Sequence, residues 1–425
     1  MKNEASTSHA DRHVRLFGRE NSALAYEIRD FLRRSVVDFD WIELQSNADC
    51  QRELGLPVLD EIRMPVVVLP DGERLFEPSV RELAHKLGWI TQPRLKEYEL
   101  SIYGAGPAGL SAAVYAASEG IQTVLIERSA IGGQAGTSSL IENYMGYPEG
   151  ISGAELAERA RQQAVKFGVD ILLLREGIKA EFVNNRIRAV MADGTQMVAR
   201  ANICATGVEY AKLDLAEEDR FLRKGLYYGA GASEAQMCKG EHVFVVGGGN
   251  SAGQAVVHFA KYAKRVTMLV RGHGPKASMS KYLSERLASL SNVEIQVNAS
   301  VQSLIGEDCL RQITLQDNRD ESQQTVDTRK LFVCIGGKPN TEWAKDTPII
   351  RDDQGYLITG PDLLNDGKAP ECWPLSRMPY FLETSVPGSF AAGDVRHGSV
   401  KRLASAVGDG AMCVTFTHRY LRETM

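Results

Sequence analysis

Short apolar runs alternate with amphipathic stretches along the chain, which predicts strands interleaved with helices. One segment shows this most clearly: an apolar strand over 100–103, a helix of small residues over 107–118 and a second apolar strand over 123–126. An apolar strand followed by a helix and another apolar strand is typical of a βαβ unit. We therefore expect an α/β protein that is organised around this segment.

The turn between the first strand and the helix carries the pattern G-x-G-x-x-G, formed by Gly104, Gly106 and Gly109. In such units the first glycine allows a tight turn, the second lets the backbone approach a pyrophosphate, and the third lets the helix pack closely on the strand. The helix N-terminus then faces the phosphates. Glu127 ends the second strand, where a carboxylate accepts hydrogen bonds from ribose hydroxyls. The segment predicts a dinucleotide site; the alternative is a tight strand-to-helix turn without a ligand.

The same pattern returns later in the chain, where Gly247, Gly249 and Ala252 follow an apolar strand and open a helix. Two such units predict two dinucleotides. No acid follows the second strand of this unit; Arg271 does, with Lys276 nearby. Cations suit the 2′-phosphate of NADP, whereas an acid would hold the free 2′-hydroxyl of NAD. The alternative is a solvated loop with two ordinary surface cations.

The N-terminal region has a different order of elements. Its pattern predicts strand, helix, strand, short helix, strand, hairpin strand and helix, with the longer elements at 13–17, 23–34, 39–44, 65–69 and 79–87. Asn21 or Ser22 is placed to cap the first long helix. This order resembles the glutaredoxin/thioredoxin fold, and Met64-Pro65 matches the position of that family's cis-proline.

The resemblance places a C-x-x-C motif at the start of the first helix, where this chain has Ser22-Ala23-Leu24-Ala25. Without a thiolate there is no nucleophile for disulfide exchange. We therefore expect a redox-inactive module that is structural or docks a partner, in preference to a hidden catalytic role.

Composition and charge narrow the range of functions. The chain has 425 residues, a formal net charge of −5 and no large basic block, which gives nucleic-acid binding no electrostatic support. No run approaches the ~18 apolar residues of a membrane helix, and the first residues lack the apolar core of a secretory signal. The seven cysteines form no C-x-x-C, so neither a metal site nor a local redox pair is predicted. We expect a cytoplasmic protein without a membrane or nucleic-acid partner.

Seven motifs, in order, resemble the low-molecular-weight thioredoxin reductase family of flavoproteins, which belongs to the pyridine nucleotide-disulfide oxidoreductases. They are G-A-G-P-A-G at 104–109, G-G-Q at 132–134, I-E-N-Y at 141–144, A-T-G at 205–207, G-G-G-N-S-A at 247–252, I-G-G-K-P-N-T at 335–341 and A-A-G-D-V at 391–395. The resemblance covers about residues 97–425.

The resemblance implies how the chain is divided into domains. A glutaredoxin/thioredoxin-like domain without C-x-x-C (1–92) precedes two Rossmann-type domains. The FAD-binding domain is split into 97–211 and 342–425, and an NAD(P)-binding domain (212–341) is inserted between its halves. FAD, NADP(H) and a homodimer are usual in that family.

The resemblance also implies which residues bind the cofactors. For FAD they are Gly104, Gly106, Pro107, Ala108, Gly109, Glu127, Gly133, Gln134, Asn143 and Asp394, and further candidates in the segment that caps the flavin are Lys401 and Arg402. For the nicotinamide nucleotide they are Gly247, Gly249, Asn250, Ser251, Ala252, Arg271 and Lys276. The amides of Gln134 and Asn143 suit flavin edges, and Asp394 suits the ribityl chain.

Two departures from the family bear on the chemistry. The family's C-x-x-C falls on Ala230 and Ser233, and Glu234 replaces the family's acid. A serine hydroxyl forms no disulfide, so we expect no ordinary thioredoxin reduction. If the segment is helical, Cys238 lies about 7.5 Å further along, too far to substitute. The second departure is a lost cation in the NADPH-binding run near Arg271, which weakens the NADP preference and leaves NADH as a second candidate.

These observations favour an FAD-dependent NAD(P)H oxidoreductase that passes electrons from reduced flavin directly to an unknown small-molecule or protein acceptor. No acid/base residue is assigned, and Glu234 is the best candidate. One alternative is a ferredoxin– or flavodoxin–NADP reductase, whose usual C-terminal extension is not expected here. The other is a non-catalytic redox sensor or docking protein. A family-atypical insertion over 361–379 is interpreted as a lid, a docking surface or a plain surface excursion.

Overall fold

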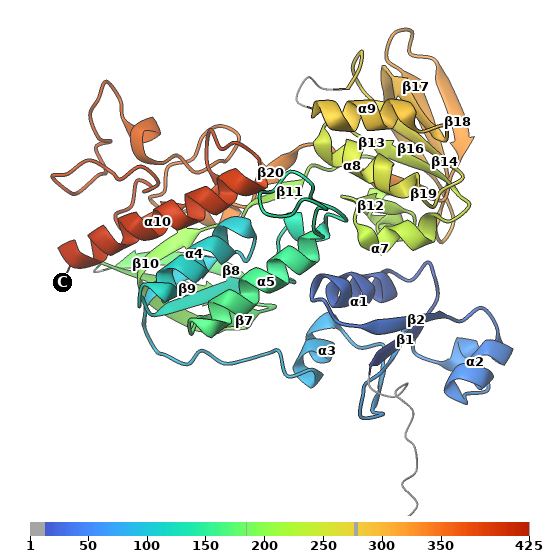
Figure 1. Cartoon of the computed structure of the whole chain (residues 1–425), viewed down its shortest axis with the longest axis horizontal. Coiled ribbons are helices and arrows are strands. Elements are labelled where there is room, and N and C mark those ends of the chain that lie inside the picture. Colours follow the sequence, from blue (N-terminus) through green and yellow to red (C-terminus); the bar gives the residue numbers. More distant parts are fainter. Residues whose placement is uncertain (1–12, 184, 276–278, 425) are drawn as a thin grey trace, which may run out of the picture. The chain divides into compact units, whose positions relative to one another are not determined.

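The computed structural model describes residues 13–183, 185–275 and 279–424 (Figure 1). The chain forms two compact units, each built from segments that are distant in sequence. One unit combines Met1–Leu87 with Lys212–Ile335, and the other combines Gly88–Ala211 with Gly336–Met425.

The second of these units is centred on a mixed sheet. Its strands are β5 (Tyr98–Tyr103), β6 (Thr123–Glu127), β7 (Asp170–Leu173), β8 (Gly177–Val183), β9 (Arg186–Met191), β10 (Gln196–Cys204) and β21 (Ser389–Ala391). The order is β7-β6-β5-β10-β9-β8, with β21 paired to β10. Strands β7, β6, β5, β10 and β21 run parallel, whereas β8 and β9 form antiparallel pairs. Strand β6 is buried throughout, which explains its continuous apolar run.

Two helices of this unit lie side by side (Figure 1). Its helices are α4 (Pro107–Ser118), α5 (Gly153–Lys166) and α10 (Leu403–Glu423). A Cβ at Gly410 would lie 2.1 Å from the Ala108 carbonyl oxygen, so glycine lets α10 approach the backbone of α4. The Ser111 hydroxyl also donates to the Val407 carbonyl oxygen at 2.8 Å. Two short strands, β11 (Val208–Tyr210) and β20 (Gly337–Pro339), pair antiparallel.

The insertion over 361–379 is fastened to the end of α10. The Arg377 guanidinium donates to Glu383 at 2.7 Å and to Glu423 at 2.8 Å. The Trp373 indole N–H donates to the Arg377 carbonyl oxygen at 2.7 Å. Because Glu383 is fully buried, this segment is anchored to the core on at least one side.

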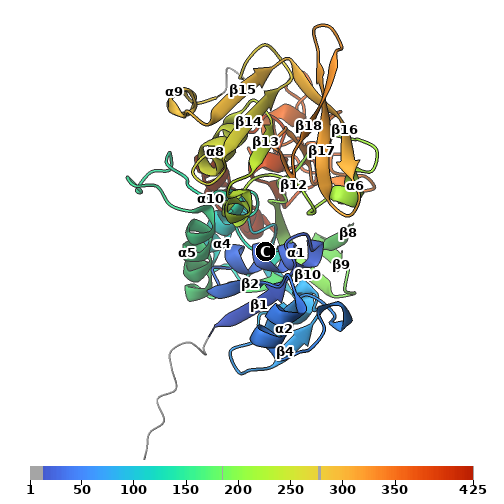
Figure 2. The same ribbon diagram turned by 90° about the vertical axis from the view of Figure 1, so that its right-hand side faces the viewer.

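In the first unit, the part contributed by Lys212–Ile335 has a five-stranded parallel sheet of order β12-β19-β13-β14-β15 (Figure 2). The strands are β12 (Leu226–Tyr228), β13 (His242–Val246), β14 (Arg265–Val270), β15 (Val293–Val297) and β19 (Lys330–Val333). The helices are α6 (Glu218–Phe221), α7 (Ala232–Ala235), α8 (Asn250–Phe259) and α9 (Lys281–Ser289). A separate antiparallel sheet contains β16 (Ala299–Gly306), β17 (Leu310–Asp317) and β18 (Gln323–Asp327).

The N-terminal part of the same unit has a four-stranded sheet of order β2-β1-β3-β4. Its elements are β1 (Val14–Gly18), α1 (Ala23–Arg34), β2 (Phe39–Glu43), α2 (Asn47–Leu54), β3 (Val66–Val68), β4 (Arg74–Phe76) and α3 (Val80–Lys86). The predicted order of elements is confirmed. Ser22 caps α1 through Ala25 N–H, and the Met64-Pro65 peptide bond is cis, as predicted.

Within the described residues, the helices are all too short or too polar to cross a membrane. The same residues hold no group of side chains arranged to bind a metal ion.

Candidate functional site

The first glycine-rich turn is closed by backbone contacts that leave no room for side chains. Gly104 has a φ of +102°, which L side chains rarely adopt, and a Cβ there would lie 2.3 Å from the Ala205 carbonyl oxygen. A Cβ at Gly109 would lie 1.8 Å from the Gly104 carbonyl oxygen. Helix α4 therefore begins directly against the ends of β5 and β10, and bare backbone surrounds its N-terminus.

Glu127 holds this turn in place. Its Oε2 accepts a hydrogen bond from Ala105 N–H at 2.7 Å, and its Oε1 accepts one from Ser129 N–H at 2.8 Å. The side chain is 8% exposed, so both bonds are shielded from water. Each oxygen keeps a second lone pair that a ribose hydroxyl could use, and the predicted ribose contact remains a prediction.

A second glycine pair covers the turn. Gly132 N–H donates to the Ala105 carbonyl oxygen at 2.7 Å. A Cβ at Gly133 would lie 3.1 Å from the Cα of Gly106, so these two segments of the chain approach each other through glycine alone. Gln134, predicted to offer its amide to a flavin, donates its side-chain N–H to the Val208 carbonyl oxygen at 2.8 Å.

Asp394 follows β21 in the same unit. A Cβ at the adjacent Gly393 would lie 3.0 Å from the Cβ of Ala108, which brings Asp394 next to the start of α4. Burial raises the pKa of Asp394, the positive charge of Lys401 lowers it, and the negative charge of Asp409 raises it.

The other FAD candidates are less closely gathered. Pro107 is the first residue of α4, where its missing N–H costs nothing. Arg402 is the N-cap residue of α10, and Lys401 donates to the Tyr356 hydroxyl at 2.8 Å. Asn143 is exposed on the loop after the 132–134 turn.

This arrangement fits the diphosphate of FAD. A cradle of glycine backbone opens at the N-terminus of α4, where backbone N–H groups and the helix dipole attract phosphate. Added side chains at Gly104, Gly109 or Gly133 would fill the cradle or collide with its walls.

The second glycine-rich turn has the same form with different surroundings. Gly247 has a φ of +146°, and a Cβ there would lie 2.5 Å from the Cys334 carbonyl oxygen and 2.9 Å from Ala252. A Cβ at Gly249 would meet nothing within 4 Å, so open space lies above the start of α8. This free approach at the helix N-terminus fits a second pyrophosphate.

The remaining nucleotide candidates play different parts. The Asn250 side-chain oxygen accepts a hydrogen bond from Ser280 N–H at 2.7 Å, which ties α8 to the start of α9. Ser251 and Arg271 are exposed, and Arg271 directly follows β14. Lys276 lies outside the described residues.

The residues to which the resemblance assigns the family's C-x-x-C, Ala230 and Ser233, lie before and on α7. Ser233 belongs to this helix, and Ala230 packs against the nearby core. Glu234 is 4% exposed; its Oε2 accepts from Gly231 N–H at 2.8 Å, and its Oε1 accepts from the Tyr26 hydroxyl. Burial raises the pKa of Glu234, and the negative charge of Asp30 raises it further.

Sequence reasoning missed the N-terminal partner of Glu234. Nothing in the local sequence connects α1 with residues more than 200 positions away. The one available signal was that Tyr26 and Glu234 each directly follow a position where the resemblance predicts a C-x-x-C motif, at 22–25 and at 230–233.

The cysteines offer no thiolate at this position. Six of the seven are buried, and Cys372 is exposed. Cys238 is fully buried, its S–H donates to the Glu234 carbonyl oxygen at 3.2 Å, and burial raises its pKa to about 12. Burial also raises the pKa of Cys204 and of Cys334 to about 12. These three thiols therefore stay protonated at neutral pH.

A family model described as pyridine nucleotide-disulphide oxidoreductase matches residues 98–410. Thioredoxin reductase from Treponema pallidum (strain Nichols) is 31% identical over 325 residues, covering 76% of this chain and 97% of that protein. The "34.2 kDa protein in rubredoxin operon" of Clostridium pasteurianum is 29% identical and covers 77% of this chain and 98% of its own length. The solved structure of T. acidophilum thioredoxin reductase matches with a TM-score of 0.67 and 27% identity, covering 78% of this chain and 100% of that chain.

Proposed function

Because the chain belongs to the pyridine nucleotide-disulphide oxidoreductase family, we propose that it moves electrons from NAD(P)H through FAD to an acceptor without a disulfide relay. The family, and relatives named thioredoxin reductase, make it an FAD-dependent oxidoreductase with a nicotinamide cofactor. FAD, when bound, supplies the two-electron chemistry: it takes hydride from the nicotinamide and passes the electrons on.

The observation that carries the proposal is the chemistry at the vacated C-x-x-C position. A buried carboxyl, Glu234, stands there with both oxygens hydrogen-bonded. Cys238, the next thiol along the chain, is buried and has a raised pKa, so it is a poor nucleophile. Without a redox-active thiol at this position, bound FAD would pass its electrons to an external acceptor, which is a small molecule or a protein. This chain's glycine turns and Glu127 would hold and orient the two nucleotides for that transfer.

We further propose that NADPH is the preferred donor. Support comes from Arg271, which is exposed directly after β14, where the 2′-position of a nucleotide bound on α8 would lie. A single cation supports a modest preference, so NADH is expected to work more weakly.

The experiment is anaerobic rapid mixing of the flavin-loaded protein with NADPH or NADH, followed at about 450 nm. Bleaching at roughly 1 s⁻¹ or faster would agree with a working reductase. Flavin that stays oxidised with both donors, yet bleaches with dithionite, would refute the proposal and favour a sensor or docking protein. Acceptors are then compared, with oxygen, quinones and ferredoxin tested before thioredoxin.

A matched variant separates direct transfer from a hidden thiol relay. Cys238→Ser keeps a small donor beside the Glu234 carbonyl oxygen and removes the sulfur. We expect flavin reduction and acceptor turnover to be unchanged. Loss of turnover with intact flavin reduction would show that Cys238 carries electrons after all.

A further inference from the structure

Within the first unit, helix α1 of the N-terminal domain lies against α7 and the adjoining sheet (Figure 1). The Tyr26 hydroxyl donates to the buried Glu234 carboxyl. The Tyr26 ring lies 5.1 Å, centroid to centroid, from the ring of Tyr227, which stacks on Phe332 at 5.1 Å. A side chain of the N-terminal domain thus completes the packing of the other domain's core.

Ion pairs flank this contact with complementary signs. Lys330 Nζ lies 2.9 Å from Glu20 Oε1, and the Lys330 side chain is 2% exposed. Arg223 pairs with Glu27 nearer the surface. The N-terminal domain supplies the acids and the other domain the bases. A buried ammonium needs such a partner, whereas the more exposed pair mainly fixes orientation.

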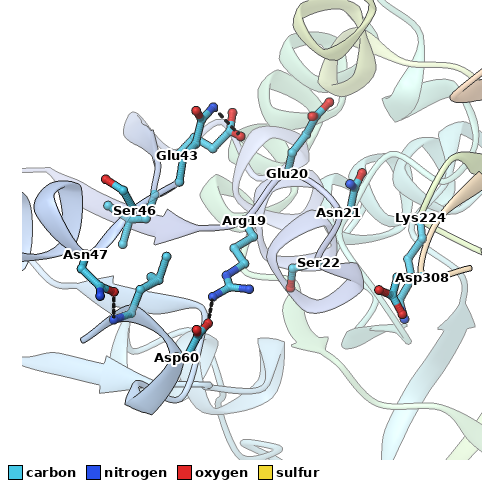
Figure 3. A pocket seen from close by; sticks show the side chains of 13 residues that line it. Arg19, Glu20, Asn21, Ser22, Glu43, Ser46, Asn47, Asp60, Lys224 and Asp308 are labelled. Atoms are coloured by element: carbon cyan, nitrogen blue, oxygen red, sulfur yellow. Dashed lines mark hydrogen bonds and ion pairs between the residues drawn. The ribbon is translucent and has the colours of Figure 1, made fainter.

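These contacts define the α1–α7 interface: Glu20, Tyr26 and Glu27 on one side, and Arg223, Tyr227, Glu234 and Lys330 on the other. A polar cleft of about 820 Å³ adjoins it, lined on the two sides by residues such as Ser22 and Lys224 (Figure 3). The close packing between the two sides of the α1–α7 interface ends at this cleft. The interface itself joins the two segments that lack a C-x-x-C motif.

We propose that the N-terminal domain permanently covers the surface that the other domain contributes to the α1–α7 interface. It moves with the NAD(P)-binding domain as one body, and it closes the segment around Glu234 to external proteins. The reason is energetic: if α1 left while Glu234 and Lys330 stayed packed, a buried carboxyl and a buried ammonium would each lose a partner. This inference does not depend on the proposed electron transfer, since a protein without turnover could keep the same closed α1–α7 interface.

Amide hydrogen exchange on the full, flavin-loaded chain tests directly whether the α1–α7 interface stays closed. Tyr26→Phe/Glu27→Arg removes the central hydrogen bond and sets a cation against Arg223. We expect exchange over 226–238 to become at least about tenfold faster, because local opening then exposes these amides. Exchange over 98–127, in the other unit, should stay unchanged and shows that this other unit is folded.

Two companion variants make the result specific. Asp71→Arg introduces the same charge change at an exposed position in the turn between β3 and β4, and its amide exchange over 226–238 should match that of the wild type. Adding Arg223→Glu to the double variant restores the ion pair with reversed polarity, and it should recover part of the protection. Unchanged exchange in the double variant would overturn the proposal.

A second measurement tests closure of the surface. Excess thioredoxin is added to the wild-type chain, and exchange over 226–238 is measured again. We expect no change. A change in protection over this segment would show that the surface is open to an external protein and would overturn the permanent occupancy.

Discussion

The two glycine-rich turns share one backbone form but differ in how they are completed. In the first, Glu127 ends β6 and binds two backbone N–H groups of its own turn and loop. In the second, β14 ends before the exposed Arg271, and the space above Gly249 is open. The first turn is a closed cradle suited to a cofactor that stays bound. The second is an open platform suited to a nucleotide that enters and leaves with each turnover.

The two turns differ most at the third glycine position of the G-x-G-x-x-G pattern, which is Gly109 in the first turn and Ala252 in the second. A substitution there is expected to have the largest effect on stability. A Cβ at Gly109 would lie 1.8 Å from a backbone oxygen, whereas the second turn already has Ala252 at the matching place. We expect Gly109→Ala to destabilise its unit by about 3 kcal/mol or more, because backbone cannot move as a side-chain tip can. The purified variant should contain little FAD, as measured by flavin absorbance.

Ala252→Gly is the matched control in the other turn. It should cost about 1 kcal/mol through helix propensity and leave flavin content intact. A Gly109→Ala protein with full flavin content and an unchanged Tm would contradict the close-packing argument.

Much of this contrast could be predicted from the sequence, because it rests on local patterns. The glycine spacing, the apolar strands and the absence of an acid after β14 were all readable, and the helix predicted over 107–118 has those bounds in the structure. The family resemblance was likewise carried by contiguous motifs. Local spacing determines such features directly, since each motif closes on its own neighbours.

Contacts between distant segments could not be predicted in the same way. The side-chain amide of Gln134 donates to the Val208 carbonyl oxygen, a contact that the local sequence did not indicate, and its predicted flavin contact stays a prediction. The side chain of Asn250 likewise accepts a hydrogen bond from Ser280 N–H, which no local pattern indicated, and its predicted nucleotide contact stays a prediction. Which groups a polar side chain hydrogen-bonds depends on which segments lie close to it in the folded chain. The pattern of a single sequence does not show which distant segments become neighbours. The Tyr26–Glu234 hydrogen bond is the extreme case.

A smaller effect is expected from the acid that closes the first turn. In Glu127→Gln, one side-chain oxygen becomes an NH₂ group that faces either Ala105 N–H or Ser129 N–H. One buried hydrogen bond is lost, which costs about 1–3 kcal/mol. We expect FAD to bind about 10- to 100-fold more weakly, as measured by flavin fluorescence on dilution.

Glu176→Gln is the control for charge alone. The Glu176 side chain is 55% exposed, and its Oε1 lies 3.7 Å from Nη1 of Arg128 in the same unit. This variant should bind FAD like the wild type. If both variants release FAD equally, net charge rather than the hydrogen bonds of Glu127 would account for retention.

The smallest expected effect concerns the open turn and decides whether it selects NADPH. Arg271→Ala removes the exposed cation after β14, and a single charge-assisted contact to a phosphate contributes about 1.5 kcal/mol. The KM for NADPH should therefore rise about tenfold while the KM for NADH stays unchanged. Arg265→Ala, at the start of the same strand and paired with Glu294, should change neither value. Because NADH lacks the 2′-phosphate, an equal rise for both donors would mean that Arg271 supports the loop rather than reading the nucleotide, and the two turns would then differ in openness but not in charge selection.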